Sequence, residues 1–201
     1  MIFDECTSGF RETFGGLHKK YGVDPDMALF SKALGNGYAI SAVIGIQEVM
    51  EATQSTFISS TFWTERIGPT AALKTLEVME REKSWKKITN TGKAISNRWQ
   101  ALAKKYELPI EISGLPSLIN FYIPVENWLK YKTFITQEML KKGFLAANSV
   151  YVCTEHTSAI IDEYFEYLEP VFATISECEA DRNIDELLEG PVCHAGFKRL
   201  N

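Results

Sequence analysis

The sequence has no stretch that stays apolar for the about 18–20 residues that a helix needs to cross a bilayer. Its first residues lack the basic segment, apolar segment and small-residue cleavage site of an export signal. The four cysteines have no C-x-x-C spacing, so we expect free thiols rather than a zinc site or disulfide bonds. A net charge of −5 offers no basic surface to nucleic acid or anionic membranes. These absences predict a cytoplasmic protein that binds neither nucleic acid nor membrane.

The distribution of apolar residues predicts an α/β fold. The 201 residues, 45% of them hydrophobic, suffice for one large domain or two modest ones. Short apolar or β-branched runs predict strands, and apolar residues at helical spacing predict helices. We expect strands at 1–3, 27–30, 40–46, 117–123, 144–147 and 150–153, and helices at 47–52, 67–79, 85–106 and 127–142, after a cap at Thr157, and at 181–188. A break between the second and third of these helices is expected near 81–84.

Two charged residues stand where apolar runs end. Asp4 follows the apolar start of the chain, and Lys32 follows the run that begins at Met27. A desolvated lysine has a lowered pKa and becomes a nucleophile, or it forms a Schiff base with a carbonyl cofactor. An Asp that pairs with a pyridinium nitrogen is the other half of pyridoxal 5'-phosphate (PLP) chemistry. From the residues alone, a solvated lysine and a turn-forming or capping Asp are the commoner alternatives.

A series of motifs in a fixed order narrows this choice. They are Phe3-Asp4-Glu5, Ser8-Gly9-Phe10-Arg11, Phe14-Gly15-Gly16, Tyr21-Gly22-Val23 with Pro25-Asp26, and Ser31-Lys32-Ala33-Leu34-Gly35 with Gly37. Together they resemble the class III aminotransferases, a branch of the fold-type I PLP enzymes, and within it the glutamate-1-semialdehyde aminomutase-like members. The resemblance is dense over residues 1–80 and weaker but continuous to the end.

The resemblance implies a role for each matched residue. Lys32 matches the lysine that holds PLP as a Schiff base and, once displaced, moves a proton between substrate and cofactor. Asp4 matches the carboxylate that keeps the pyridine nitrogen protonated, which makes the ring a better electron sink. The implied substrates are a small-molecule amino donor and a carbonyl acceptor.

The resemblance also implies a phosphate contact made across a homodimer. Ser60 and Thr61 match a Ser-Thr pair ahead of a helix, whose threonine contacts the PLP phosphate of the neighbouring subunit. Hydroxyls near a helix N-terminus suit anions, because unpaired backbone N–H groups point the same way. An ordinary helix cap is the alternative, and the hydroxyl-rich stretch leaves Thr64 as a further candidate.

The glycines after Lys32 and the arginine Arg11 are the remaining residues near the expected site. Gly35 and Gly37 are expected to form the tight turn beside Lys32 rather than a phosphate loop, because a short G-x-G alone is a weak signal. The absence of a G-x-G-x-x-G motif opening a helix argues against a Rossmann-type dehydrogenase. Arg11 is expected in a structural ion pair, with anchoring of a substrate carboxylate as the alternative.

The family places its phosphate-binding loop and ring-stacking aromatic upstream of the Asp, which is nearly the first residue here. We therefore expect the chain to be the C-terminal portion of a larger protein. Residues 1–65 would be part of the PLP-binding large domain, with a mainly parallel sheet, 66–106 would be linking helices, and 107–201 a small α/β domain. The alternative to an amino-group-transferring enzyme is a truncated, catalytically silent remnant that acts as a structural or binding module.

Overall fold

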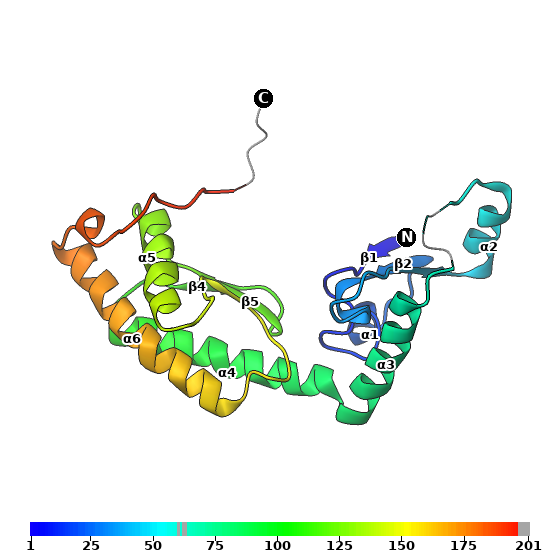
Figure 1. Cartoon of the computed structure of the whole chain (residues 1–201), viewed down its shortest axis with the longest axis horizontal. Coiled ribbons are helices and arrows are strands. Elements are labelled where there is room, and N and C mark those ends of the chain that lie inside the picture. The colour runs from blue at the N-terminus through cyan, green and yellow to red at the C-terminus, as the bar shows by residue number, and fades with distance from the viewer. Residues whose placement is uncertain (60, 62–63, 197–201) are drawn as a thin grey trace. The chain divides into compact units, whose positions relative to one another are not determined.

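The computed structural model describes residues 1–59, 61 and 64–196 of the chain (Figure 1). The chain forms two compact units, residues 1–89 and 90–201, and each has a three-stranded sheet of its own. Both units combine helices with strands, as the sequence predicts for an α/β fold. The domain boundaries expected near residues 65 and 106 stay predictions. Within the described part of the chain, no helix is both long and apolar enough to cross a membrane.

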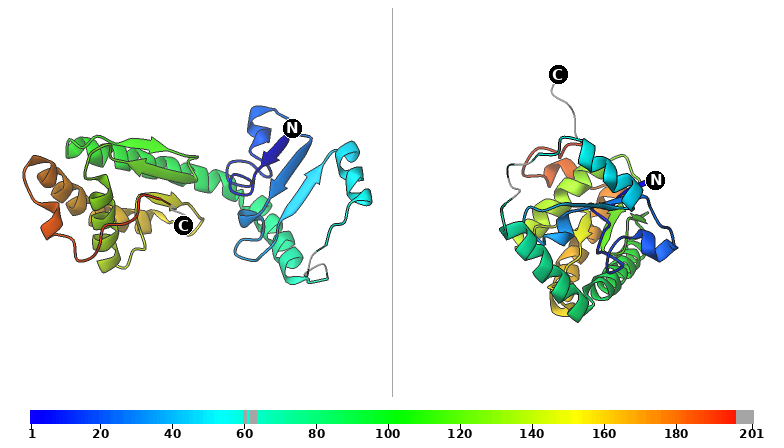
Figure 2. Two further views of the ribbon diagram at one scale, coloured as in Figure 1. Left: turned by 90° about the horizontal axis from the view of Figure 1, so that it is seen from above. Right: turned by 90° about the vertical axis from the view of Figure 1, so that its right-hand side faces the viewer.

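The sheet of the first unit has the strand order β1-β2-β3, and the strands run side by side in Figure 2. β1 (Ile2–Asp4) pairs in parallel with β2 (Met27–Phe30), which places Asp4 opposite Leu29. β2 pairs antiparallel with β3 (Ala42–Gly45). The three predicted strands are thus confirmed, and the sheet contains one parallel and one antiparallel pair.

The core of the first unit lies between this sheet and a long helix. The unit's other elements are α1 (His18–Tyr21), a 3-10 turn η1 (Lys32–Leu34), α2 (Gln47–Met50), a second 3-10 turn η2 (Glu51–Ser55) and α3 (Ile67–Glu82). Ala28 and Phe30 of β2 pack with Leu34 of η1 and Ala72 of α3. The helix α3 ends where Lys83 adopts a left-handed conformation with φ of 51°. The predicted break before the next helix is therefore confirmed.

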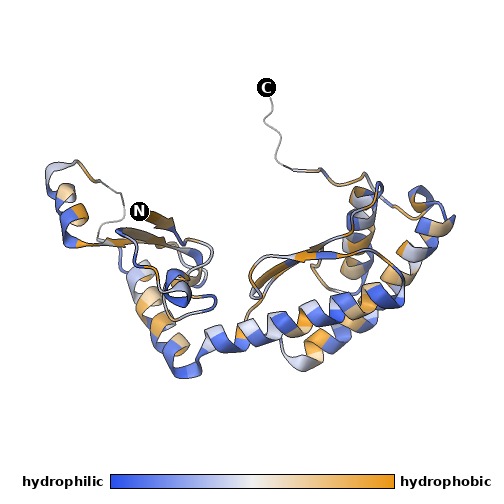
Figure 3. Ribbon diagram, turned by 180° about the vertical axis from the view of Figure 1, so that it is seen from behind, coloured by the Kyte–Doolittle hydropathy of each residue, from blue (hydrophilic) through white to orange (hydrophobic). Residues whose placement is uncertain are grey.

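The second unit is built around buried aromatic rings. Its elements are α4 (Ser84–Lys105), which begins before the division, β4 (Glu111–Ser113), β5 (Leu118–Tyr122), α5 (Trp128–Lys141), β6 (Ser149–Tyr151), α6 (Ser158–Ala180) and a 3-10 turn η3 (Ile184–Glu186). The strands pair antiparallel in the order β4-β5-β6. Trp99 is fully buried, with its ring centroid 4.8 Å from that of Phe121, and its Nε1 donates to the hydroxyl of Tyr164 at 3.1 Å. Apolar and polar residues alternate along these helices (Figure 3), as expected of amphipathic segments.

Two expected elements of the second unit are wrong. Residues 144–147 form no strand, because the Phe144 N–H bonds to Met139 O and closes the C-terminal end of α5 instead. The helix expected at 181–188 is reduced to the 3-10 turn η3. The side chain of Gln137 on α5 donates to Leu187 O and accepts from the Glu189 N–H, so these backbone groups bond to α5 and not within a helix of their own.

A buried carboxylate anchors the loop that follows β1. Glu5 is only 3% exposed, and it accepts hydrogen bonds from Leu17 N at 2.5 Å, His18 N at 3.0 Å and Ser8 Oγ at 3.2 Å. Its carboxylate also lies 2.7 Å from His18 Nδ1. Burial alone would raise the pKa of Glu5, but these hydrogen bonds outweigh burial, and its pKa lies below the ordinary 4.5. Because Asp4 is the preceding residue, this anchor also fixes the end of β1.

We expect Glu5→Gln to lower the free energy of unfolding by about 2 kcal/mol at neutral pH, because a carboxamide puts a donor where backbone N–H donors converge. Urea unfolding followed by circular dichroism measures this difference. Glu48→Gln, at an exposed position on α2, is the matched control and should change little.

The same pair of proteins gives a pH test. Because the folded-state pKa of Glu5 lies below its unfolded value, its stabilising effect is complete above about pH 4.5 and is lost as the pH falls through the folded pKa. The gap between wild type and Glu5→Gln should therefore narrow in acid. A gap that stays constant from neutral pH to about pH 3 would contradict the anchoring role.

Candidate active site

Asp4 and Lys32 meet at one edge of the first sheet. β1 and β2 are parallel neighbours, so their carboxyl ends lie together, and Asp4 ends β1 while Lys32 comes two residues after β2. Both side chains are exposed. The Cys6 N–H donates to Asp4 Oδ1 at 3.0 Å and is the main reason why the pKa of Asp4 is lowered, followed by the Cys6 thiol and, more weakly, by the charge of Lys32. The carboxylate is therefore ionised at neutral pH.

The backbone holds Lys32 in a rare conformation. Its φ of 41° lies in the left-handed region, which residues with a side chain usually avoid. Hydrogen bonds from Leu34 N to Ser31 O and from Asn36 N to Lys32 O, at 2.9 and 3.0 Å, close the turn around it. The hydroxyl of Ser31 donates to Ile40 O at 3.2 Å and ties the turn to the segment before β3.

The glycines beside the lysine form the turn that the sequence predicts. Gly37 has a φ of 105°, which glycine adopts readily. At Gly35 a Cβ atom would lie 2.1 Å from Tyr38 O, so no other residue fits without displacement of the backbone. Both residues thus serve the backbone path from Lys32 towards β3.

Two further residues, Thr7 and Cys6, touch the site and do not stand out in the sequence. Lys32 Nζ donates a hydrogen bond to Thr7 Oγ1, and Cys6 contacts Asp4 through its backbone and side chain. The hydrogen bond with Asp4 and, next, burial raise the pKa of the Cys6 thiol. Only their position, in the gap between two recognised motifs, could have singled them out. Arg11 Nε donates to Thr7 O at 3.4 Å, so this arginine supports the same loop.

The predicted phosphate contacts lie ahead of α3. Ser60 is outside the described residues, and Thr61 and Thr64 are exposed in turns. The carboxylate of Glu65 accepts hydrogen bonds from Ile67 N and Gly68 N at the start of α3. The first N–H groups of this helix are thus already bonded to an anion. The phosphate role of Ser60 and Thr61 stays a prediction.

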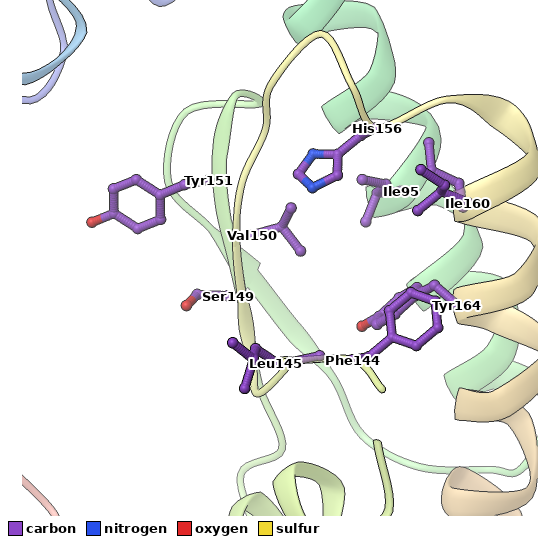
Figure 4. Close-up of a pocket in the computed structure, with 11 residues that line it drawn as sticks. Ile95, Phe144, Leu145, Ser149, Val150, Tyr151, His156, Ile160 and Tyr164 are labelled. Carbon is purple, nitrogen blue, oxygen red and sulfur yellow. The ribbon is translucent and has the colours of Figure 1, made fainter. Parts of the chain in front are cut away.

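An apolar pocket of about 250 Å³ lies in the second unit (Figure 4). Phe144, Leu145 and Ile160 line it together with His156, whose Nδ1 accepts from Cys153 N at 3.1 Å. Neither a lysine nor a carboxylate of the described residues lines the pocket. Within the described part of the chain, no group of three or more His, Cys, Asp or Glu residues could hold a metal ion.

The family model described as "Aminotransferase class-III" matches residues 1–165. Among curated proteins, the 3-aminobutyryl-CoA aminotransferase of Cloacimonas acidaminovorans is 35% identical over 139 residues, which are 69% of this chain and 31% of that protein. The glutamate-1-semialdehyde 2,1-aminomutase of Methanocaldococcus jannaschii is 28% identical over 86% of this chain and 44% of that protein. The chain thus spans less than half the length of these relatives.

Solved structures show the same fold. The FumI protein of Sphingopyxis sp. MTA144, in its PLP internal aldimine form, superimposes with a TM-score of 0.82 over 93% of this chain and 46% of its own, at 20% identity. An S-selective transaminase from Arthrobacter sp. gives a TM-score of 0.75 over 89% of this chain and 45% of its own, also at 20% identity. The fold is thus a partial α/β PLP-transferase fold. The chain belongs to the class-III aminotransferases.

Proposed function

We propose that this chain carries the lysine and the ring-nitrogen carboxylate of a PLP-dependent enzyme that transfers an amino group. The enzyme would move the group from an amino donor to an aldehyde or keto acceptor, or within one molecule. The observation that carries the proposal is the meeting of Lys32 and Asp4 at one edge of a parallel strand pair. Membership of the class-III aminotransferases supports it.

The two side chains have the chemistry that PLP requires. When bound, PLP supplies an aldehyde for covalent attachment and a protonated pyridine ring that withdraws electrons. Asp4 would hold the proton on the ring nitrogen, because its lowered pKa keeps the carboxylate charged. Lys32 would bind the aldehyde carbon through a Schiff base. Its Nζ, once displaced by substrate, would carry a proton from one carbon to another as general base and then general acid.

The proposal covers both reactions named among the relatives, aminotransfer and aminomutation, because both need the same lysine and carboxylate. We further propose a homodimer in which Thr61 of one chain contacts the phosphate bound by the other. Thr61 is exposed, as such a contact requires.

A catalytically silent binding module is the second candidate, and one observation favours it. The first sheet exposes large apolar side chains, with Ile2 66%, Ile44 56% and Val43 48% exposed. Apolar groups on strands typically face a core or a partner. A chain that binds another polypeptide there, without holding PLP, would explain this surface.

Covalent trapping separates the two candidates. In the full chain incubated with PLP, the Lys32 amine should condense with the aldehyde and release water, and borohydride should then reduce the C=N bond to a stable product. Mass spectrometry of peptides should locate this product at Lys32. Lys32→Ala should abolish it, and Lys74→Ala should not. Absence of the product at saturating PLP would favour the silent module.

The left-handed conformation of Lys32 predicts a stability signature. Glycine relieves the steric strain of a positive φ, whereas alanine retains it. We expect Lys32→Gly to be about 1 kcal/mol more stable than Lys32→Ala in urea unfolding. The same pair of substitutions at Lys74, inside α3, should show the opposite order, because glycine destabilises helix interiors. The same order of stability for the glycine and alanine variants at both positions would contradict strain at Lys32.

Asp4→Asn tests the role of the carboxylate. Asn keeps an acceptor for the Cys6 N–H but cannot hold a proton on a pyridine nitrogen. We expect the rate of amino transfer from L-alanine to bound PLP to fall about 100-fold or more, with a much smaller loss of PLP affinity. Stopped-flow absorbance and a PLP titration measure the two quantities. Comparable losses in the rate of amino transfer and in PLP affinity would argue that Asp4 contributes only to PLP binding.

A further inference from the structure

The ε-amine of Lys32 is tied to the loop that follows β1. Lys32 Nζ donates to Thr7 Oγ1, and Thr7 is half-buried while Lys32 is exposed. Thr7 lies three residues after Asp4, so the bond joins the two segments that carry the candidate catalytic groups. A lysine side chain loses rotamer entropy when it is held in one place, so an exposed lysine needs such a partner to stay in position.

The loop that presents Thr7 is itself held on both sides. Gly9 N donates to Glu5 O at 2.9 Å and closes a turn around Thr7. Arg11 Nε donates to Thr7 O at 3.4 Å, and Arg11 O accepts from Thr89 Oγ1 at 3.4 Å. Threonine is also β-branched, which restricts its χ1 rotation. The hydroxyl therefore has a defined place before the lysine reaches it.

We propose that Thr7 is a positioning residue for Lys32, whose hydroxyl holds the ε-amine at the edge of the sheet beside Asp4. A hydroxyl suits this task because it accepts a hydrogen bond from an ammonium or amine N–H and can also donate to a neutral amine. The bond therefore persists in both protonation states through which a Schiff-base lysine passes. The inference rests on the proposed function, because it assigns Thr7 to the reaction of Lys32 with PLP.

Three variants of the full chain test the proposal. Thr7→Val keeps the shape of the side chain but removes its hydroxyl. Thr7→Ser keeps the hydroxyl. Thr13→Val is the matched control, because the Thr13 hydroxyl lies in the same loop but donates to Gly16 O at 2.7 Å. Circular dichroism verifies that each variant folds, and Thr7→Ala, which also lacks the hydroxyl, takes the place of Thr7→Val if Thr7→Val does not fold.

The first measurement needs no PLP. In ¹⁵N-lysine-labelled chain, hydrogen exchange of the Lys32 ammonium with water should be about fivefold faster in Thr7→Val than in wild type, since loss of one hydrogen bond is worth about that factor. Thr7→Ser and Thr13→Val should resemble wild type. Equal exchange in Thr7→Val and wild type would overturn the proposal, whether or not the chain binds PLP.

The second measurement follows the initial rate of PLP attachment at Lys32 by borohydride trapping. We expect a fall of about fivefold to tenfold in Thr7→Val and near wild-type rates in Thr7→Ser and Thr13→Val. Faster ammonium exchange without a slower attachment would overturn the positioning role. Failure of wild type to attach PLP at all would refute the proposed function of this chain, and the exchange rates would then still decide whether Thr7 holds the amine.

Discussion

The burial of the Glu5 carboxylate is the constraint on which the candidate site depends. A buried charge is tolerated only when hydrogen bonds replace its lost water, and here the N–H groups of Leu17 and His18 and the Ser8 hydroxyl do so. The loop from residue 8 to residue 18 must therefore fold back onto the end of β1. Asp4, Cys6 and Thr7 take their places as a consequence, because they flank the anchored residue.

Local sequence patterns predict the three strands of the first unit well. The three strands of the first unit are short apolar runs, and the parallel pairing of two of them brings Asp4 and Lys32 to one edge. The turn at Gly35 and Gly37 could also be predicted, because few residues other than glycine tolerate its geometry. In these cases the residue types themselves, with little help from distant contacts, determine the backbone conformation.

Contacts between segments distant in sequence could not be predicted in this way. The bond from Lys32 to Thr7 spans 25 positions, and the contact of Gln137 with Leu187 spans 50. The apolar run at 144–147 shows a limit at shorter range, because the Phe144 N–H bonds to Met139 O and closes α5 instead of pairing in a sheet. The capping of α3 by Glu65 is a local contact, but it could not be predicted either, because neither the hydroxyls before the helix nor its apolar spacing indicates which group binds its N-terminus.

The strained backbone at Lys32 has an evolutionary consequence. A chain released from the need for a reactive amine would relieve this strain by mutation of the position to glycine, and would lose only the exposed hydrogen bond to Thr7 in exchange. Drift would therefore erase the lysine sooner than it would erase Asp4, which stabilises its own turn through the Cys6 N–H. The residue at position 32 in a descendant of this chain thus indicates whether the amine has stayed under selection.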